Sequence, residues 1–304
     1  MQPRTLQRQT WQFGDIRISK IPEIPLSGSQ PATLFPDGWN ETWLSPLAQQ
    51  LDAHSLSSNG LLEQSVHSWL VQTPQHNILI DTATGNGKHF PELPRFHQLN
   101  SQWLENLQAL GVSEVQIDYV LLTHLHVDHV GWNTQYSQGE WRPRFTNATY
   151  FLSAREQRQQ ADNLQQAQPT DLPSRIYAES IAPIIASGRY QFIPENGVEI
   201  LPGIRFLSTP GHSVDHQSII IDTPEGTAFF SGDLMHHPLQ VYYPQLNSRY
   251  CEAPDLAKQS RLKALDYASS GDVIWFSSHF ADTSAGRVTR VGEGYSWSFL
   301  AERA

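Results

Sequence analysis

The sequence predicts a mixed α/β domain, and two observations carry this prediction. First, short apolar runs typical of strands are followed by a helical pattern and then by a histidine-bearing loop, and this order occurs twice along the chain. Second, the chain has 304 residues, of which 39% are hydrophobic and 11% aromatic. That is enough for a sizeable core, and we expect a single domain over residues 1–304.

Composition narrows the classes of function and partner. The net charge of −10 gives no advantage in neutralising a phosphate backbone, so we expect no nucleic-acid partner. No apolar run reaches the roughly 18 to 20 residues that span a bilayer. The first residues also lack the apolar core of a signal peptide. We therefore expect a cytoplasmic protein without a membrane partner.

The chain has one cysteine, Cys251. It cannot form an intrachain disulfide, and no cluster of thiolates is available to hold zinc. Any metal site must therefore use nitrogen and oxygen ligands, and we expect Cys251 to be a packing residue.

The N-terminal part begins with a strand and continues into a long loop. Residues 11–21 alternate apolar and polar side chains, with a turn at Gly14-Asp15. Residues 22–60 are rich in Pro, Gly, Ser and Asn but also carry aromatic side chains. Loops of this length are uncommon unless they have a function or are disordered. We interpret this segment as an ordered loop extension that forms a flap or a dimer contact, with plain surface packing as the alternative.

The next elements lead up to the first histidine-bearing loop. Residues 66–71 and 77–81 predict a hairpin, and residues 100–110 predict an amphipathic helix that ends at Gly111. Residues 118–122 form an apolar run of the kind that makes a buried strand.

A helical segment follows the strand predicted at residues 150–152. Ser153 opens a polar helix to residue 168, with Glu156 as the partner in a capping box, and residues 174–186 predict a second helix. We interpret residues 153–188 as a helical insertion that covers or borders a pocket, with a solvated helix pair as the alternative. The strands then return, and one more helix lies among them; the expected strands are 191–193, 198–200, 204–207, 218–221, 227–230 and 273–276, and the helix is 255–268.

The most informative stretch is Thr123-His124-Leu125-His126-Val127-Asp128-His129. It places four potential metal ligands at the end of the strand predicted at residues 118–122. In an extended segment His124 and His126 point the same way, because the side-chain period of a strand is two. Asp128 and His129 follow as the chain turns towards Gly131, so they can face a second point beside the first. The spacing indicates two metals rather than one.

This motif resembles the His-x-His-x-Asp-His signature of the metallo-β-lactamase superfamily. The remaining positions of the family pattern are filled in order, by His212 in a Pro-Gly-His context, Asp233 in a Gly-Asp pair and His279 near the end of the matched region. The resemblance extends from about residue 66 to residue 279. It implies a four-layer αββα sandwich, with the metals at one edge of two facing sheets.

The resemblance also implies a ligand set and a chemistry. Seven ligands would hold two divalent ions, with His124, His126 and His212 on one metal, Asp128, His129 and His279 on the other, and Asp233 as the bridge. Zinc suits these ligands, and manganese, iron and cobalt are the alternatives. A hydroxide bridging two such metals attacks a carbonyl carbon or a phosphorus, and Asp128 would orient it or carry its proton.

Three further residues are predicted to support the ligands or to line the pocket. Asp81 begins a segment that resembles the family's Asp-Thr-Gly loop, with Ala83 in place of the glycine. We expect Asp81 to support the ligands through hydrogen bonds, with a turn-forming aspartate as the alternative. Trp132 and Phe280 stand next to the ligand motifs and are expected to play similar supporting or pocket-lining roles.

Differences within the family narrow the function. The chain lacks the cysteine ligand of the commonest zinc β-lactamases, carries His126 where flavodiiron proteins carry glutamate, and has no basic cluster at residues 290–304 for glutathione. Acyl-homoserine-lactone lactonases and methyl-parathion-hydrolase-like phosphotriesterases remain. Many of the lactonases place a tyrosine three residues after the bridging aspartate, where this chain has His236. We expect His236 to donate a proton or hydrogen bond to the substrate, with a structural role for His236 and His237 as the alternative.

The sequence thus predicts a binuclear metallohydrolase that acts on a small, rather apolar, uncharged ester. A lactone is the first choice of substrate, and a phosphotriester is the second. A metal-binding protein without hydrolytic turnover is the alternative from a different class. The expected partner is a small-molecule substrate, and a homodimer is compatible with the sequence.

Overall fold

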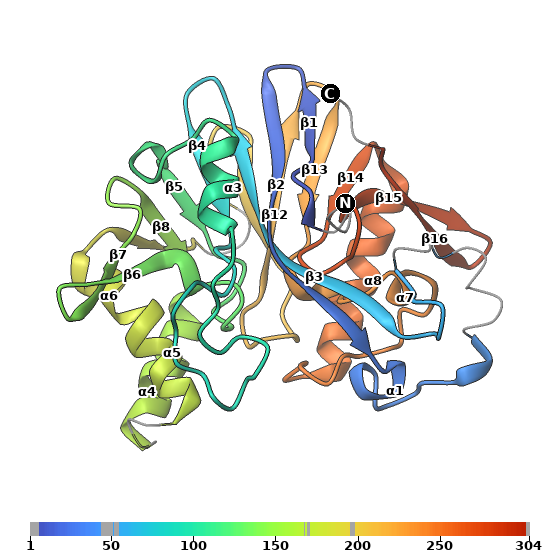
Figure 1. The fold of residues 1–304 in the computed structure, drawn as a ribbon. Helices are drawn as coiled ribbons and strands as arrows, with labels where there is room; N and C mark the ends of the chain where they lie inside the picture. The colour runs from blue at the N-terminus through green and yellow to red at the C-terminus, as the bar shows by residue number, and fades with distance from the viewer. Residues whose placement is uncertain are drawn as a thin grey trace. The chain divides into compact units, whose positions relative to one another are not determined.

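The computed structural model describes residues 6–43, 51, 55–166, 168, 171–194 and 198–301 (Figure 1). Parts of the predicted loop extension and helical insertion, namely residues 44–50, 52–54, 167 and 169–170, lie outside the described residues. The chain divides into two compact units. We call Asp15–Glu23 with His67–Ile193 the middle unit, and Met1–Gly14, Ile24–Val66 and Pro194–Ala304 together the C-terminal unit. Whether the whole chain acts as a single domain stays a prediction.

The middle unit is built on a mixed sheet. Its strands run in the order β2, β3, β4, β5, β8, β9, with the bounds β2 Ile16–Ser29, β3 Leu62–Gln72, β4 Asn77–Ile80, β5 Tyr119–Leu121, β8 Thr149–Leu152 and β9 Tyr190–Phe192. The part of β2 after Glu23 and the part of β3 up to Val66 belong to the C-terminal unit. β3 and β4 form the predicted antiparallel hairpin, with Trp69 opposite Ile80. The pairs β4–β5, β5–β8 and β8–β9 are parallel. The short, mostly apolar sequences of β4, β5 and β8 suit strands that are buried on both faces, whereas β9 is largely exposed.

The register of β4 and β5 places two loops at one edge of this sheet. Ile80 is the partner of Leu121, so both strands end at the same level. The chain leaves β4 at Asp81 and leaves β5 just before Thr123. The predicted supporting loop and the predicted ligand loop therefore start side by side.

The predicted loop over residues 22–60 is partly wrong, because β2 continues to Ser29. Residues 22–29 are thus strand, and the loop proper begins only at Gln30. Two short helices follow, α1 over Pro31–Leu34 and η2 over Glu41–Trp43. The prediction failed because Pro22 and Pro25 indicated a loop, whereas the strand continues through both prolines.

The helices and the small hairpin of the middle unit follow the ligand-bearing strands. They are α3 Trp103–Ala109, η3 Glu114–Gln116, η4 Gly131–Asn133, α4 Ala154–Gln166, α5 Leu172–Ser180 and α6 Ala182–Ser187, with the hairpin strands β6 Thr134–Ser137 and β7 Glu140–Pro143. The single helix predicted over residues 174–186 is in fact two. The chain breaks at Ile181, and Pro183 in the first turn of α6 has no N–H to continue the α5 hydrogen bonds. No helix within the described ranges is both long and apolar enough to cross a membrane.

The C-terminal unit contains a second large sheet. Its strands lie in sequence order, β10 Glu199–Leu201, β11 Ile204–Ser208, β12 Gln217–Thr223, β13 Gly226–Phe230, β14 Val273–Phe276, β15 Ala285–Val291 and β16 Gly294–Phe299. Only β13 and β14 pair in parallel. The other elements of this unit are β1 Thr10–Phe13, η6 Gly232–Leu234, α7 Leu239–Tyr242 and α8 Pro254–Ser270. Gly14 follows β1 in the predicted turn, with a positive φ of 60°.

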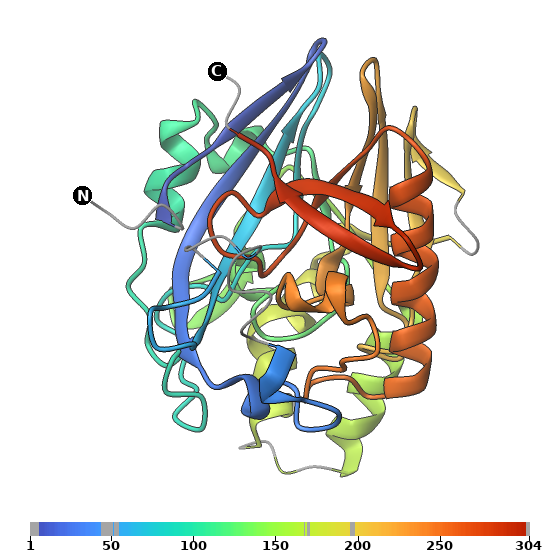
Figure 2. The same cartoon turned by 90° about the vertical axis from the view of Figure 1, so that its right-hand side faces the viewer.

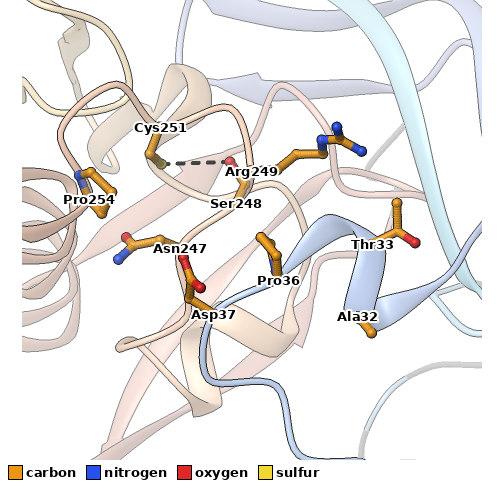
Figure 3. A pocket seen from close by; sticks show the side chains of 9 residues that line it. All are labelled: Ala32, Thr33, Pro36, Asp37, Asn247, Ser248, Arg249, Cys251 and Pro254. Atoms are coloured by element: carbon orange, nitrogen blue, oxygen red, sulfur yellow. Dashed lines mark hydrogen bonds between the residues drawn. The ribbon is translucent and has the colours of Figure 1, made fainter.

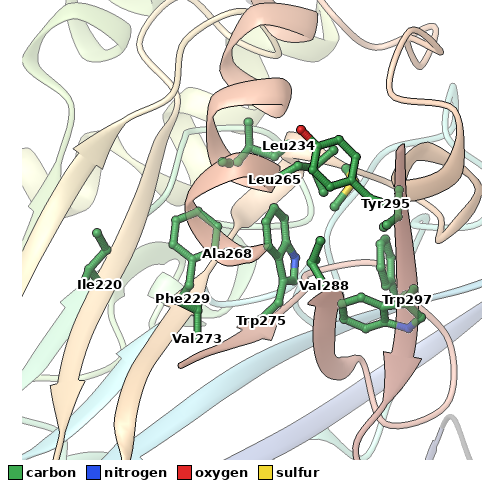
Figure 4. Packing of buried hydrophobic residues seen from close by; sticks show 14 residues of the cluster. Ile220, Phe229, Leu234, Leu265, Ala268, Val273, Trp275, Val288, Tyr295 and Trp297 are labelled. Carbon is green, nitrogen blue, oxygen red and sulfur yellow. The ribbon is translucent and has the colours of Figure 1, made fainter. Parts of the chain in front are cut away.

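Helix α8 runs along this sheet and closes its core (Figure 2). Pro254 at its start and Asp255 in its first turn suit the N-terminus of a helix. Its buried face carries Leu265 and Ala268, which pack in one cluster with Trp275 of β14 (Figure 4). Because Trp275 is completely buried, this cluster fixes the helix against the strands from which the ligand loops leave.

A buried lysine joins the parts of the middle unit. Lys88 is almost completely buried, and its Nζ donates to Thr134 Oγ1 at 3.1 Å. The same Nζ lies 3.8 Å from the ring centroid of Trp141. Burial lowers the pKa of Lys88 to about 7, and the nearby charge of Arg144 acts in the same direction, whereas Glu179 opposes it.

This lowered pKa predicts a pH dependence of stability. Between about pH 7 and pH 10.5 the unfolded chain keeps a proton on Lys88 that the folded chain has released, so folding becomes more favourable as the pH rises. The gain approaches about 1.4 kcal/mol per pH unit for one group. Lys88→Met should remove it, so the difference in unfolding free energy between wild type and variant should grow in favour of the wild type from pH 7 to pH 9. Urea unfolding measures this, and the exposed Lys258→Met is the control. A difference that stays constant with pH would show that Lys88 remains charged when folded.

Candidate metal-binding site

The middle unit brings together the histidines of the ligand loop. The ring centroid of His124 lies 4.5 Å from that of His126 and 4.0 Å from that of His129. His124 and His129 are buried, each with 1% of its surface exposed, and His126 and Asp128 are partly exposed. His129 Nε2 lies 3.8 Å from Asp128 Oδ1. The loop thus presents imidazole nitrogens and a carboxylate from one short segment.

Asp81 sets the orientation of His129. Its Oδ2 lies 2.8 Å from His129 Nδ1 and accepts a hydrogen bond from Thr123 Oγ1 at 2.8 Å, while its Oδ1 accepts from the Thr123 N–H at 2.8 Å. The carboxylate is buried and its residue has a positive φ of 54°. When Nδ1–H of an imidazole donates to a carboxylate, Nε2 is the atom that binds a metal. Asp81 therefore makes the contacts expected of a supporting carboxylate.

Backbone hydrogen bonds lock the Asp81 loop to the ligand loop. The Thr82 N–H donates to His129 O at 2.7 Å, and the Gly131 N–H donates to Ala83 O at 2.7 Å. The two segments approach so closely that a Cβ at Gly131 would lie 1.7 Å from Thr84 O. Only glycine fits there, which explains the glycine directly after the histidine motif.

A buried glutamate that the sequence did not single out anchors the same loop. Glu23 accepts hydrogen bonds from the backbone N–H groups of Thr84 at 2.8 Å and Gly85 at 2.9 Å, and from Trp132 Nε1 at 2.6 Å. Burial raises the pKa of Glu23, although these hydrogen bonds counteract the effect. Trp132 lies in the interior, where its ring stacks on that of Trp103 with the ring centroids 5.0 Å apart. Glu23 lies far away in sequence, in a strand, so nothing local marked it.

Helix α4 also reaches the ligand loop. Ser153 Oγ caps the helix by accepting from the Glu156 N–H at 3.1 Å, as predicted. Glu156 Oε2, however, accepts from the N–H of Leu125 at 2.7 Å, and Gln160 Nε2 donates to Leu125 O at 3.0 Å. The start of the predicted insertion thus holds the backbone between His124 and His126.

The C-terminal unit gathers three histidines around one carboxylate oxygen. Asp233 Oδ2 lies 3.3 Å from His212 Nε2, 3.4 Å from His236 Nε2 and 3.1 Å from His279 Nε2. All four side chains are buried. His212, Asp233 and His236 form a group whose donor atoms could share one ion.

Two of these histidines are held by neighbouring elements, His212 by α8 and His279 by β3. Gly211 has a φ of 127°, and a Cβ there would lie 2.1 Å from the backbone nitrogen of Ala257 in α8. The Pro-Gly-His segment therefore lies directly against the helix, which sets where His212 starts. His279 Nδ1 lies 3.0 Å from the carbonyl oxygen of Ser65, and this contact turns its Nε2 towards Asp233.

His216 positions Asp233 and was not recognised in the sequence. Its Nε2 accepts the N–H of Asp233 at 2.9 Å, and its Nδ1 lies 2.9 Å from Thr209 Oγ1. Because Nε2 accepts, the proton of the neutral ring is on Nδ1. The only signal was its place four residues after His212, which does not distinguish a supporting histidine from a ligand.

The pair His236 and His237 divides into two roles. His237 is completely buried, its Nε2 donates to Ser55 O at 2.8 Å, and burial lowers its pKa to about 4. It is a neutral structural histidine. His236 instead faces Asp233, and its ring stacks on that of His279 with centroids 5.3 Å apart. Phe280 lies in the core, completely buried, with its ring 5.1 Å from that of Trp297.

The donor atoms of both sets fit a divalent transition metal. Imidazole nitrogens and carboxylate oxygens are the ligands of zinc in proteins, and they also suit manganese, iron and cobalt. The middle unit supplies His124, His126, Asp128 and His129, and the C-terminal unit supplies His212, Asp233 and His279 with His236 beside them. In each set a buried carboxylate or histidine orients a neighbouring predicted ligand, an arrangement that is typical of metal sites.

The sequence was compared with models of known protein families. The Metallo-beta-lactamase superfamily model matches residues 62–279. The chain belongs to the metallo-β-lactamase superfamily. The predicted fold class, the α/β metallo-β-lactamase fold, is therefore confirmed.

Curated relatives of this chain include lactonases. An N-acyl homoserine lactonase of Bacillus cereus is 27% identical over 180 residues, which is 56% of this chain and 63% of the lactonase. The lactamase-like protein nscB of Arthroderma gypseum is 29% identical over 214 residues, which is 69% of this chain and 52% of that protein. The matched region thus spans less than two thirds of each relative.

Solved structures share the fold over nearly the whole chain. The hydrolase AbOPH of the beta-lactamase superfamily superimposes with a TM-score of 0.79 at 24% identity, covering 98% of both chains. AidC, a dizinc quorum-quenching lactonase solved with its product N-hexanoyl-L-homoserine, gives a TM-score of 0.77 at 19% identity, again over 98% of both chains. At these identities the likeness shows the fold alone.

The contacts of Asp81 predict a loss of metal affinity on substitution. Asp81→Asn removes the charge that accepts from His129 Nδ1, so the imidazole becomes less basic and less well oriented. We expect metal affinity to fall by about 10- to 100-fold, measured by competition with a chromogenic chelator. Asp118→Asn is the matched control, because Asp118 also accepts a backbone N–H, from Asn77 at 2.8 Å, but contacts no ligand. Equal affinities in both variants would leave Asp81 as a turn-forming residue.

Proposed function

We propose that this member of the metallo-β-lactamase superfamily is a hydrolase with two metal ions that opens a small, uncharged lactone or carboxylic ester. The observation that carries the proposal is the presence of seven buried or half-buried nitrogen and oxygen ligands in the family's order, each set braced by a supporting side chain.

The two ligand sets are proposed to act together. His124, His126 and His212 would hold one ion, Asp128, His129 and His279 the other, and Asp233 would bridge them. When bound, two divalent ions supply an activated water at neutral pH and polarise the oxygen under attack. Zinc is our first choice because its preferred ligands match the set, and manganese, iron and cobalt would be accommodated by the same atoms.

The protein's own residues orient the reactants. Asp81 and His216 hold His129 and Asp233 in place, so the ligands need little rearrangement during the reaction. Asp128 is partly exposed and could orient the attacking water through its carboxylate. We propose that His236 donates a proton from Nε2 to the oxygen of the leaving group, and its position beside Asp233, 3.4 Å from Oδ2, supports this role.

The relatives favour a lactone as the substrate. The N-acyl homoserine lactonases of Bacillus cereus and of Bacillus thuringiensis match 56% of this chain. An uncharged lactone also suits a protein of net charge −10, which would repel an anionic substrate. We therefore propose N-acyl homoserine lactones, or lactones of similar size, as the first substrates to test.

One observation favours a phosphotriester as the second candidate. His236 occupies the position where many of the lactonases have a tyrosine, and this feature resembles the parathion-hydrolase branch of the superfamily. A water activated at one site can attack either a carbonyl carbon or a phosphorus. Phosphotriester turnover would then be either the main activity or a side activity of the lactonase.

Metal content and a substrate panel test the proposal. Protein loaded with excess zinc and then desalted should contain two ions per chain by mass spectrometry, and it should open lactones faster than it cleaves phosphotriesters. Asp233→Asn should lose both metal content and activity, because an amide offers no second anionic oxygen for a bridge. One ion or none in the wild type would contradict the binuclear site. Two ions without turnover of any lactone, ester or phosphotriester would favour a metal-binding protein.

His236→Phe separates the roles of proton donor and metal ligand. As a donor, His236 should matter for kcat alone, so the variant should lose about 10²- to 10⁴-fold in kcat with two ions still bound. The loss should be larger for lactones, whose alkoxide needs a proton, than for nitrophenyl esters. His76→Phe is the control, because His76 packs on Tyr119 and contacts no ligand. Loss of one ion in His236→Phe would make His236 a ligand, and equal loss on both substrate types would make it a packing residue.

A further inference from the structure

His236 is not one of the seven proposed ligands, yet its ring faces the same carboxylate oxygen as two of them. Its Nε2 lies 3.4 Å from Asp233 Oδ2, and His212 Nε2 lies 3.3 Å from the same oxygen. The donor atoms of His212, Asp233 and His236 all lie within 4.8 Å of one another. Of the groups of this kind among the described residues, it is the one that comes from a single unit.

These separations match a metal site better than a pair of hydrogen bonds. In a tetrahedral zinc site, bonds of about 2.0–2.1 Å place neighbouring ligand atoms about 3.3–3.4 Å apart. An N–H···O hydrogen bond is usually about 2.7–3.2 Å long. The distances from Asp233 Oδ2 to His212 and His236 therefore equal two edges of such a tetrahedron, whereas His279 Nε2, at 3.1 Å, lies within hydrogen-bond range.

The position of His236 is fixed by its backbone and by its ring. The backbone N–H donates to Gln240 Oε1 at 2.7 Å, and the carbonyl oxygen accepts from Gln64 Nε2 at 2.8 Å. The ring stacks with that of His279, with centroids 5.3 Å apart, and with that of Tyr250, with centroids 5.8 Å apart. A donor atom that is held in this way loses little freedom when it binds an ion.

A cavity next to Ser248 provides a path by which an ion can reach this buried group. Ser248 Oγ lies 3.4 Å from His236 Nε2, and Ser248 also lines a cavity of about 400 Å³ (Figure 3). The charged residues of the lining are Asp37 and Arg249, so the cavity has no net positive charge that would repel a cation. A buried metal site requires an entry path of this kind.

We propose that His212, Asp233 and His236 form a loading site that binds the first divalent ion. The inference rests on the proposed function for one point, the final position of the two ions. In the filled site Asp233 bridges both ions and His236 is not a ligand, so His236 holds an ion only until the second one binds. The C-terminal unit can therefore take up a metal without a ligand from the middle unit.

This role predicts how the two steps of metal binding depend on His236. Removing the imidazole weakens the first step, because the loading site loses a ligand. The total free energy of binding two ions stays the same, because the filled site does not use His236. The second step must therefore become stronger by the factor that the first step loses, and binding becomes more cooperative.

Titration of the metal-free protein with zinc, in competition with a chromogenic chelator, measures both steps. In His236→Phe the dissociation constant of the first ion should rise about tenfold or more, and that of the second should fall by the same factor. Two ions should still bind at saturation. His89→Phe is the matched control, because His89 is exposed and packs on His97 without contacting a proposed ligand. Both constants should stay within about twofold of wild type in this control.

A second variant protects the test against misfolding. His236→Gln keeps a polar side chain at the buried position and should change both constants in the same directions as His236→Phe. A first constant that is unchanged in both variants would overturn the proposal. A weaker total affinity for two ions would also overturn it, because His236 would then be a permanent ligand.

His126→Ala separates the loading site from the proposed function. His126 belongs to the middle unit, so its loss should weaken only the second step. A wild type that binds one ion through His236 and hydrolyses no ester would support the loading site and contradict the hydrolase. A wild type that hydrolyses lactones with two ions, but loses the first ion in His126→Ala and keeps it in His236→Phe, would retain the function and overturn the loading site.

Discussion

The buried carboxylate of Asp81 is the contact on which the ligand loop depends. It lies where β4 ends, beside the end of the parallel strand β5, and it binds the backbone and hydroxyl of Thr123 together with the ring of His129. Because β4 and β5 pair in parallel, their ends lie side by side. The hydrogen bonds of Asp81 then fix the orientation of the side chains of Thr123 and His129. The ligand loop is thus held by the sheet rather than by its own sequence.

The C-terminal unit reaches the same result by a different route. Here the carboxylate is itself a proposed ligand, and a histidine, His216, holds it through the backbone. β13 and β14 again pair in parallel, so the chain leaves both strands at one edge, towards Asp233 and towards His279. In each unit, therefore, a predicted ligand that follows a strand is held by a residue from another part of the chain: His129 by Asp81, and Asp233 by His216.

The sequence predicted the parts of this arrangement that are local. The ligands of the middle unit lie within one short segment, and the hairpin β3–β4 and the helix α8 have clear periodicity. It did not predict Glu23 or the link from Glu156 to Leu125, because those contacts join segments distant in sequence. The hairpin β6–β7 was missed since Gln138-Gly139 is a weak turn signal, although both residues have positive φ. The strands β15 and β16 were also not predicted, although the side chains of β16 alternate between aromatic residues and serine.

The link between Glu156 and Leu125 changes how the helical segment after β8 should be regarded. In sequence it looks like an addition to the fold that could be shortened or exchanged between relatives. Its first turn, however, supplies the acceptor for a buried N–H inside the proposed ligand loop, so that turn helps to hold the loop in place. Variation in length is then compatible with the loop only beyond Gln160, whose side chain makes the last of these contacts. A chimera that exchanged the helices at Ser153 would also replace the side chains that hold the backbone of the proposed ligand loop.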